Sequence, residues 1–516
     1  MALFDANVAI GRMTSCRGGF DGAEPLKAEM RRLGVAEALV YHLTAAEADV
    51  VLGNRMLIEA LRGQENLYPC WVMTPPALED LPEPETWVRE ATAQGVRAVR
   101  MFPAHSLYTF RDWCVEPLLA ACEGASLPVF VDFGRHHWSN RAIPWNEIKT
   151  VCEAHPKLNV VVVGATTGET RDAWAMAQCR PNLYLDYSEF TTPDILALAA
   201  GQAYWEYLLY GSGLPFRAAE CGVAQTRRSG LSGECLAALE GNNARRILGL
   251  PLTRTSAAAE LEEYEGPVID VHAHSGAWER TITPHRSAAA TLDSMDRCGI
   301  DKIVMSSFAA IHGETRRGNR QTAELIDQCI GRVYGYAVIN PHYPEEVPAE
   351  LEFCFREARG FVGLKLHCGL HGVRVEHPGY EEALAFASES HLPVLVHGGG
   401  QDKWESVAQK YPGASFIIAH ACAWDGHDVA GRTLFGLARD VENLYVDVAG
   451  SAAHRDAMAA LVALTGAGKI LFGSDYPMFD LAFELGRVTL SALAMEDKAA
   501  ICAGNAQRIF HRLAAT

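Results

Sequence analysis

The sequence predicts an α/β fold of two tandem (β/α)8 barrels, and three observations carry that prediction. The chain has 516 residues, more than one ordinary hydrophobic core accommodates. Its two halves repeat one another, and each half alternates short apolar runs with longer stretches of helical spacing. This alternation is typical of parallel strands buried on both faces, and eight such units in about 250 residues match one barrel.

The internal repeat runs through the whole chain in one constant order. FDANVAIG faces IDVHAHSG, GVRAVRMF faces FVGLKLH, LPVFVDFG faces LPVLVHGG, NLYLD faces NLYVD, and LLYGSGLP faces ILFGSDYP. The tripeptide GNR occurs in both halves, and each half ends in a related helix, NNARRIL or GNAQRIF. The repeat predicts one barrel at residues 1–250, a linker at 251–267 and a second barrel at 268–516.

The expected strands follow the first strand of each half in order. In the first half they are ALVYHL, CWVMTP, VRAVRMF, VFVDF, NVVVVG, LYLDY and YLLYG. In the second half they are IVMSS, YGYAVINP, GLKLH, PVLVH, SFIIAH, LYVDVA and ILFGSD. A doubly wound open sheet is the alternative architecture, but it does not explain why polar residues end so many different strands.

Histidines and an aspartate occupy the expected strand ends of the second half. Asp270-x-His272-x-His274 ends the first strand, and residues i and i+2 of a strand share a face. The fifth, sixth and eighth strands end in His397, His420 and Asp475. Because strand ends converge at the C-terminal face of a barrel, we expect these side chains to meet there. Imidazole and carboxylate ligands suit a catalytic Zn²⁺ or a similar divalent ion.

The motifs DVHAH, GLKLH, VLVH, IIAH and FGSDYP resemble the amidohydrolase superfamily. The most similar branch is the one that includes aminocarboxymuconate semialdehyde decarboxylase. The resemblance covers residues 268–512 and, in degraded form, residues 2–250. It implies one divalent metal ion, expected to be zinc, with the ligands His272, His274, His397 and Asp475. It also implies that His420 transfers protons, and we add Asp475 as the second catalytic group.

Lys365 on the fourth strand has two interpretations. Binuclear members of the superfamily bridge two metals with a carboxylated lysine of this strand, which would make Lys365 a ligand of a second metal. His367 lies nearer the strand's end on the same face, which leaves Lys365 deeper in the barrel. A salt bridge to an interior acid is the structural alternative there, and we favour a site with a single metal.

The first half lacks these ligands. The positions that correspond to His272, His274, His397, His420 and Asp475 hold Asn7, Ala9, Asp132, Gly164 and Gly213. Asp5 is retained opposite Asp270, and the resemblance implies a structural role for it. His105, His136 and His137 are expected to lie on the surface or along a pocket. We therefore expect the first barrel to be a pseudoenzyme domain.

Three functions fit the second barrel. We put first a metal-dependent hydrolase, in which Asp475 or His420 takes a proton from the metal-activated water that attacks an amide, ester or lactone. The alternative is a non-oxidative decarboxylase, in which the same residues protonate carbon as a small unsaturated or aromatic acid loses CO₂. A binding or scaffold protein with a relic metal is the third candidate, and the intact ligand set argues against it.

Cationic and aromatic residues in the expected βα loops favour a small, anionic, carboxylate-bearing substrate. The expected substrate-binding residues are Arg171, Trp278, Arg280, His367, His371 and Arg432. Related barrels of the decarboxylase branch form dimers in which an arginine after the sixth strand reaches the partner's site. Arg432 and Arg171 lie in that loop of the two halves, so we expect an internal pseudo-dimer with Arg171 at the second half's metal site. Further homo-oligomerisation stays open.

Charge and composition exclude several partners. The formal net charge of −18 argues against nucleic acid and anionic membranes, which bind basic faces. No apolar run approaches the ~20 residues of a membrane span, and the start of the chain does not read as a signal peptide. The 14 cysteines contain no C-x-x-C pair. We read them as reduced thiols and expect a cytoplasmic protein.

Overall fold

The structure, a computed structural model, describes residues 3–14, 18–134, 142–202, 204–252, 261–284, 287–400, 403–421, 429–450 and 454–514. The chain divides into two compact units. One comprises residues 1–191 with 195–262, and the other comprises 192–194 with 263–516.

The first unit is a closed parallel barrel. Its strands are β1 (Leu3–Arg12), β3 (Val35–His42), β4 (Leu67–Val72), β5 (Ala98–Met101), β6 (Val129–Asp132), β7 (Val160–Val163), β8 (Leu183–Asp186) and β9 (Leu208–Leu209). They pair in sequence order, and β2 (Gly19–Phe20) adds an antiparallel edge to β1. A hydrogen bond from Ala6 N to Tyr210 O, 2.8 Å, and a parallel bridge between Val8 and Leu214 join the first strand to the last.

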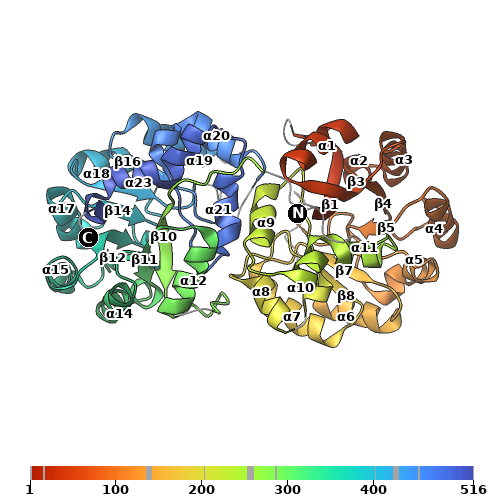
Figure 1. Cartoon of the computed structure of the whole chain (residues 1–516), viewed down its shortest axis with the longest axis horizontal. Coiled ribbons are helices and arrows are strands. Elements are labelled where there is room, and N and C mark those ends of the chain that lie inside the picture. Colours follow the sequence, from red (N-terminus) through yellow and green to blue (C-terminus); the bar gives the residue numbers. More distant parts are fainter. Residues whose placement is uncertain are drawn as a thin grey trace. The chain divides into compact units, whose positions relative to one another are not determined.

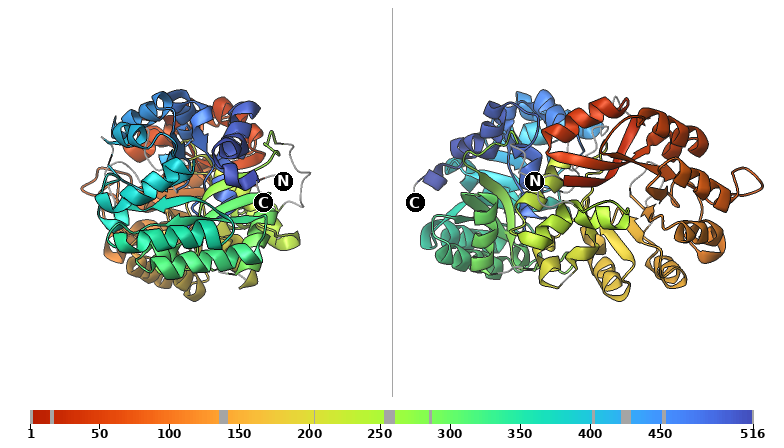
Figure 2. Two further views of the ribbon diagram at one scale, coloured as in Figure 1. Left: turned by 90° about the vertical axis from the view of Figure 1, so that its left-hand side faces the viewer. Right: turned by 45° about the vertical axis from the view of Figure 1, so that its right-hand side comes forward.

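Helices surround these strands, as the red-to-yellow part of Figure 2 shows. They are α1 (Ala23–Arg32), α2 (Leu43–Glu47), α3 (Val50–Ala60), α4 (Pro84–Ala93), α5 (Asp112–Gly124), α6 (Trp145–Ala154), α7 (Thr170–Cys179), α8 (Ile195–Gly201), α9 (Ala219–Arg227), α10 (Gly233–Ala237) and α11 (Asn243–Ile247). Most strand residues are buried, which agrees with the mostly apolar runs of the sequence.

The second unit repeats this architecture. Its strands are β10 (Ile269–Ser275), β11 (Lys302–Ser307), β12 (Val333–Val338), β13 (Phe361–Leu366), β14 (Pro393–Val396), β15 (Ser415–Ile418), β16 (Leu444–Asp447) and β17 (Ile470–Leu471). All neighbouring pairs are parallel and follow sequence order. Val271 N donates to Phe472 O at 3.0 Å, which closes the sheet. The predicted pair of (β/α)8 barrels is confirmed.

The helices of the second unit, green to blue in Figure 1, lie outside its strands. They are α12 (Ala288–Cys298), α13 (Phe308–Ile311), α14 (Thr315–Gln328), α15 (Val347–Glu352), α16 (Cys368–His371), α17 (Glu381–Glu389), α18 (Trp404–Lys410), α19 (Val429–Asp440), α20 (Ala457–Thr465), α21 (Leu481–Thr489), α22 (Met495–Ala499) and α23 (Asn505–Ile509). Strand residues alternate between two apolar clusters. Val394 and Val396 pack with the surrounding helices, whereas Leu395 belongs to a cluster that α23 also joins.

An irregularity in β10 positions the H-x-H motif. The pairing of β10 with β11 shifts register between Asp270 and Ala273. The buried Asp270 Oδ1 accepts hydrogen bonds from His272 N at 3.0 Å and from Ser474 N at 3.1 Å. Asp270 therefore ties the first strand to the segment after the last strand. Burial raises the pKa of its carboxyl to about 7.

Asp5 likewise ties the first strand of the first barrel to the segment after its last strand. The register of β1 shifts between Asp5 and Val8, and Asp5 Oδ1 accepts from Asn7 N at 3.0 Å and Ser212 N at 2.9 Å. Burial again raises the pKa of the carboxyl to about 7. The structural role expected of Asp5 agrees with these contacts, which need no metal.

The repeated GNR tripeptide also has a structural cause. Asn54 Nδ2 donates to Val72 O at 2.8 Å, and Val72 N donates to Asn54 Oδ1 at 2.9 Å. In the second barrel, Asn319 makes the same pair of bonds to Val338, at 3.2 and 3.0 Å. Each asparagine therefore satisfies the backbone N–H and C=O of the last residue of the third strand.

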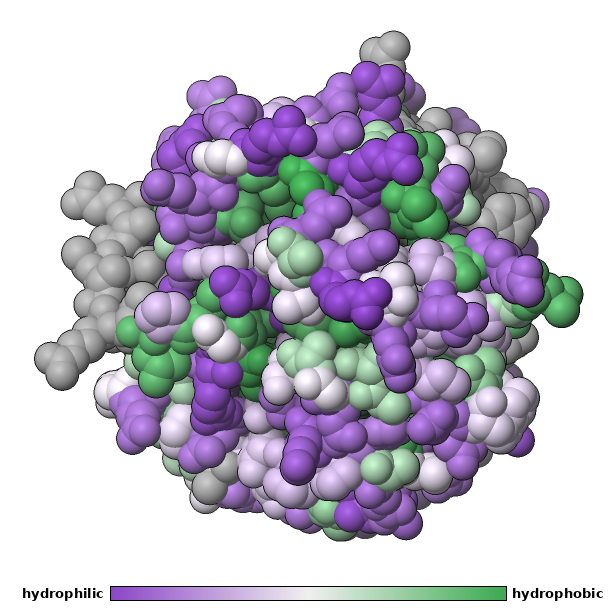
Figure 3. Space-filling model, turned by 90° about the vertical axis from the view of Figure 1, so that its right-hand side faces the viewer, coloured by the Kyte–Doolittle hydropathy of each residue, from purple (hydrophilic) through white to green (hydrophobic). Residues whose placement is uncertain are grey.

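The face of the molecule in Figure 3 is mostly hydrophilic, and its hydrophobic residues form separate small groups. Within the described ranges, no helix combines the length and the apolar character that a membrane span requires.

We predict that Asn54→Ala lowers the free energy of unfolding of the first barrel by about 1–3 kcal/mol, because it leaves a buried strand N–H and C=O without partners. Urea denaturation measures the loss. The neighbouring exposed Arg55 provides the control, and Arg55→Ala should change stability by less than about 0.5 kcal/mol. Equal stability of the two variants would show that the asparagine does not hold the strand.

Candidate metal centre

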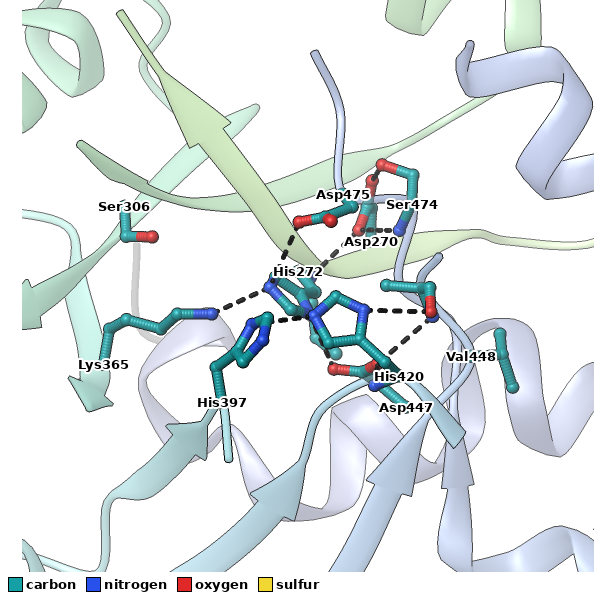
Figure 4. A network of polar contacts seen from close by, with 12 residues as sticks. Asp270, His272, Ser306, Lys365, His397, His420, Asp447, Val448, Ser474 and Asp475 are labelled. Atoms are coloured by element: carbon teal, nitrogen blue, oxygen red, sulfur yellow. Dashed lines mark hydrogen bonds and ion pairs between the residues drawn. The ribbon is translucent and has the colours of Figure 1, made fainter. Parts of the chain in front are cut away.

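Three of the predicted residues converge at the mouth of the second barrel. His272, His420 and Asp475 each offer one ligand atom, and these atoms lie within 4.8 Å of one another. They come from β10, from the end of β15 and from the end of β17 (Figure 4). His272 and Asp475 are buried, and His420 is half-buried. Imidazole nitrogens and a carboxylate oxygen are the donors that Zn²⁺ and similar divalent ions take, so these residues fit a metal.

His274 and His397 each lie within hydrogen-bonding distance of one residue of this group. His274 Nε2 is 2.9 Å from Asp475 Oδ1, and His397 Nδ1 is 2.9 Å from His420 Nε2. All four ligands implied by the resemblance therefore lie in one connected cluster. Among the described residues, however, the closest group contains His420 in place of His274 and His397.

Asp447, at the end of β16, orients two of the histidines and is absent from the predicted site. The carboxylate is fully buried, and its Oδ2 lies 2.8 Å from His272 Nδ1. Its Oδ1 accepts a hydrogen bond from His420 N at 2.8 Å. With Nδ1 engaged, His272 presents Nε2 to the centre, which is the usual arrangement around a metal-ligating histidine. The one signal in the sequence is that NLYVD recurs as NLYLD.

Ser306 and Phe308 fix His274 and were also missed. Ser306 Oγ is 3.1 Å from His274 Nδ1. The ring of Phe308, at the start of α13, stacks on His274 with centroids 4.6 Å apart and an interplanar angle of 20°. Ser306 lies at the end of the second strand and Phe308 directly follows it, and no site residue was predicted at this strand's end.

Lys365 makes its contact with a histidine. Its Nζ lies 2.8 Å from His272 Nε2 (Figure 4). Neither of the two interpretations of Lys365, a ligand of a second metal or a salt bridge to an interior acid, named this contact. The side chain is fully buried, and burial lowers its pKa to about 8. Because His272 has a single lone pair at Nε2, the amine and a metal ion compete for it.

The protonation states match those of metal ligands. Burial lowers the pKa of His272 to about 4. Burial opposes ionisation of Asp475, yet the histidines His272, His274 and His420 together hold the pKa of this carboxyl well below its usual range. At neutral pH the site therefore has a charged carboxylate and a neutral imidazole, the forms that bind a metal.

The corresponding positions of the first barrel hold an ion pair. Arg100, which aligns with Lys365, is buried, with Nη2 2.7 Å from Asn7 Oδ1 and 2.5 Å from Asp132 Oδ2. Its guanidinium lies over the ring of Tyr41, 4.4 Å from the centroid. A fixed cation therefore sits among the residues that replace two of the ligands.

Asp186 of the first barrel lacks the histidine partner that its counterpart in the second barrel has. It aligns with Asp447, and its Oδ1 accepts from Ser188 N at 2.8 Å. Its buried Oδ2 has no hydrogen-bond partner in the described part of the chain, because Asn7 stands where the second barrel has His272. Burial raises the pKa of Asp186 to about 6.

Two site residues of the second barrel have a strained backbone. His420 has φ of 67° and Asp475 has φ of 60°, in the left-handed region that favours glycine. The first barrel has Gly164 and Gly213 there, with φ of 90° and 69°. A Cβ at Gly164 would lie only 2.5 Å from a backbone nitrogen. At these two positions the first barrel therefore has neither the backbone strain nor the side chains of the second barrel.

Some predicted substrate-binding residues lie beside the centre. The His367 ring stacks on His397 with centroids 4.1 Å apart. Trp278 is half-buried, 5.9 Å from the Phe308 ring, and the exposed Arg280 lies 5.5 Å from its centroid. These side chains connect to the centre through aromatic contacts.

The remaining predictions are placed elsewhere or not described. His371 is buried, and both of its ring nitrogens are engaged, at 3.0 Å from Tyr380 Oη and 3.2 Å from Ile311 O. Its role in binding substrate stays a prediction, and in this structure its ring bonds to the protein itself. Arg171 is exposed in α7, and His105 is half-buried. The residues outside the described set are His136, His137 and the side chain of Arg432.

The comparisons with known proteins agree with the repeat. The family model described as Amidohydrolase matches residues 19–250 and again residues 269–512. No curated protein matches the sequence.

Solved structures resemble about half of the chain. A 2,6-dihydroxybenzoate decarboxylase from Rhizobium has 17% identity and a TM-score of 0.37, over 48% of this chain and 98% of its own. The 5-carboxyvanillate decarboxylase from Sphingomonas paucimobilis has 14% identity and a TM-score of 0.37, over 48% and 99%. A putative amidohydrolase from Staphylococcus aureus has 15% identity and a TM-score of 0.37, over 48% and 100%.

We predict that, in metal-free protein, His420→Gly is more stable than His420→Ala by about 1 kcal/mol, because glycine relieves the left-handed strain while both variants lose the ring. Thermal unfolding of the two variants gives the difference. At His312, whose φ is −91°, the same two substitutions should follow the ordinary order, with alanine the more stable. The same order at both positions would contradict the assignment of strain to His420.

Proposed function

The chain belongs to the amidohydrolase family, and we propose that its second barrel is a metal-dependent decarboxylase of a small unsaturated or aromatic acid. The observation that carries the proposal is the single connected cluster of His272, His274, His397, His420 and Asp475. These residues match, one by one, the ligands and the acid/base group implied by the resemblance to the decarboxylase branch. We propose zinc as the ion.

The charges of the site favour a carboxylate substrate. Asp475 and Asp447 bring two negative charges, and Lys365 and a divalent ion together bring more positive charge. The resulting net positive charge attracts an anionic substrate, and the burial of these groups strengthens that attraction. The half-buried ring of Trp278, which contacts Phe308, offers a flat apolar surface to an unsaturated acid.

His420 is suited to move the proton. Its Nδ1 is 3.1 Å from Ala449 O, and a carbonyl only accepts, so Nδ1 carries the hydrogen. Nε2 then has the lone pair that takes up a proton and returns it to the substrate carbon. The metal, when bound, supplies Lewis-acid stabilisation of the negative charge that builds up on the substrate. Asp475 and Asp447 hold the neighbouring imidazoles in place.

The hydrolase that we placed first in the sequence analysis uses the same residues. The two reactions differ in products, because decarboxylation in D₂O places one deuterium on the carbon that lost CO₂, and hydrolysis does not. A panel of aromatic and unsaturated acids, run beside esters, lactones and amides, separates them. Bicarbonate release with deuterium incorporation is the expected result. Turnover of the esters, lactones or amides alone would replace the decarboxylase proposal.

We predict close to one equivalent of divalent metal per chain, held by the second barrel. Elemental analysis of the purified protein measures it, and His272→Ala should release the metal. Asp132→Ala, the matched variant of the first barrel, should retain it, because Asp132 pairs with Arg100. Two equivalents, with one lost in Lys365→Ala, would indicate a binuclear site instead.

We predict that His420→Gln and Asp475→Asn each lower kcat by about 10²–10⁴-fold, because each removes a group that moves or directs the proton. Initial rates on the substrate found in the panel measure the effect. His105→Gln in the first barrel is the control and should leave kcat unchanged. A comparable loss in that control would assign catalysis to both barrels.

A further inference from the structure

We propose that Glu484 and Arg487 are positioning residues for His420, acting through the loop that follows β16. The inference rests on the proposed role of His420 in proton transfer. The pair lies on α21, which follows the eighth strand, and its hydrogen bonds run to the loop after β16.

The carbonyl of Ala449 decides which nitrogen of His420 carries the hydrogen. It accepts from Nδ1, at 3.1 Å, so in the neutral ring the lone pair lies on Nε2, which faces His397 Nδ1. If this carbonyl turned away, Nδ1 would lose its partner and both tautomers would form. The direction of one backbone carbonyl therefore sets the reactive nitrogen.

Arg487 holds the two peptide groups on either side of that carbonyl. Its Nη1 donates to Val448 O at 2.6 Å, and its Nη2 donates to Gly450 O at 2.5 Å. With the carbonyls before and after it fixed by one rigid guanidinium, Ala449 O points toward the His420 ring. Asp447 Oδ1 also restrains this loop, because it accepts a hydrogen bond from Ala449 N at 3.1 Å.

Glu484 keeps the guanidinium in place. Arg487 Nη2 lies 2.9 Å from Glu484 Oε1, one helical turn away, and both residues are buried. An isolated buried charge costs several kcal/mol, so a buried arginine requires such a counterion. The pair is expensive to bury, which argues for a function that an apolar pair would not perform.

The first barrel lacks both the imidazole that corresponds to His420 and the pair that corresponds to Glu484 and Arg487. Helices α9 and α21 have equal lengths at equivalent positions, and α9 has Gly222 and Gln225 where α21 has Glu484 and Arg487. Gln225 Nε2 donates to Phe190 O at 3.2 Å instead. Scaffold residues common to both barrels persist, but this pair disappears together with the imidazole of His420.

Nitrogen NMR on protein labelled with ¹⁵N-histidine tests the proposal without substrate. The zinc-loaded wild type should show one His420 tautomer, with the hydrogen on Nδ1, and His420→Gln identifies the signals by their loss. Arg487→Lys keeps the charge beside Glu484 but loses the rigid fork. It should give a mixture of tautomers at unchanged zinc content. Glu484→Gln, which keeps the guanidinium, is the second variant if Arg487→Lys does not fold.

Arg320→Met is the matched control. Arg320 pairs with the buried Glu350 at 3.0 Å in the same barrel, far along the chain from the loop after β16. This variant should leave the His420 signals unchanged. An unaltered His420 tautomer in folded Arg487→Lys, or an equal change in Arg320→Met, would overturn the proposal.

Kinetics then separate this inference from the proposed function. Arg487→Lys should lower kcat about tenfold in the wild-type background and by less than about twofold in the His420→Gln background, because the two residues act as a unit. Equal losses in both backgrounds would show that Arg487 does not act through His420. A changed tautomer in a protein without decarboxylase activity would leave the positioning role intact and reject only the reaction.

Discussion

The hydrogen bond between Asp447 and His272 organises the candidate metal centre. One carboxylate oxygen lies 2.8 Å from the imidazole, and the other accepts from the backbone nitrogens of His420 and Ala449. A single buried side chain thus orients a proposed ligand, the proposed acid/base residue and the carbonyl that fixes its tautomer. Such outer contacts usually account for much of the affinity of a metal site.

Comparison of the two barrels distinguishes the contacts that stabilise the fold from those that form the candidate site. Asp5 and Asp270 close both barrels, and Asn54 and Asn319 hold both third strands. These contacts use no side chain of a proposed ligand, so the first barrel retains its fold without those side chains. Its centre carries Arg100, paired with Asp132, as a built-in cation. We propose that this ion pair makes the first barrel independent of metal.

Sequence patterns predicted the strands and the residues at their ends, because alternation and strand order determine which side chains reach the mouth of a barrel. They did not reveal the partners of those side chains. Asp447 ends a strand with no metal motif, and the contact of Lys365 with His272 depends on how far a flexible chain reaches across the barrel. The contact of His371 with Tyr380 was not predictable either, because a loop histidine near a site has the same sequence pattern whether it faces the substrate or bonds to the protein.

The affinity of the protein for zinc, measured by competition with a chromogenic chelator, tests the account most directly. Asp447→Asn should weaken zinc binding by about 10–100-fold, because the amide no longer holds His272 in its ligating orientation. Asp186→Asn, the equivalent change in the first barrel, should leave zinc affinity unchanged. Equal affinity in Asp447→Asn and the wild type, or a loss in Asp186→Asn, would contradict the central role of Asp447.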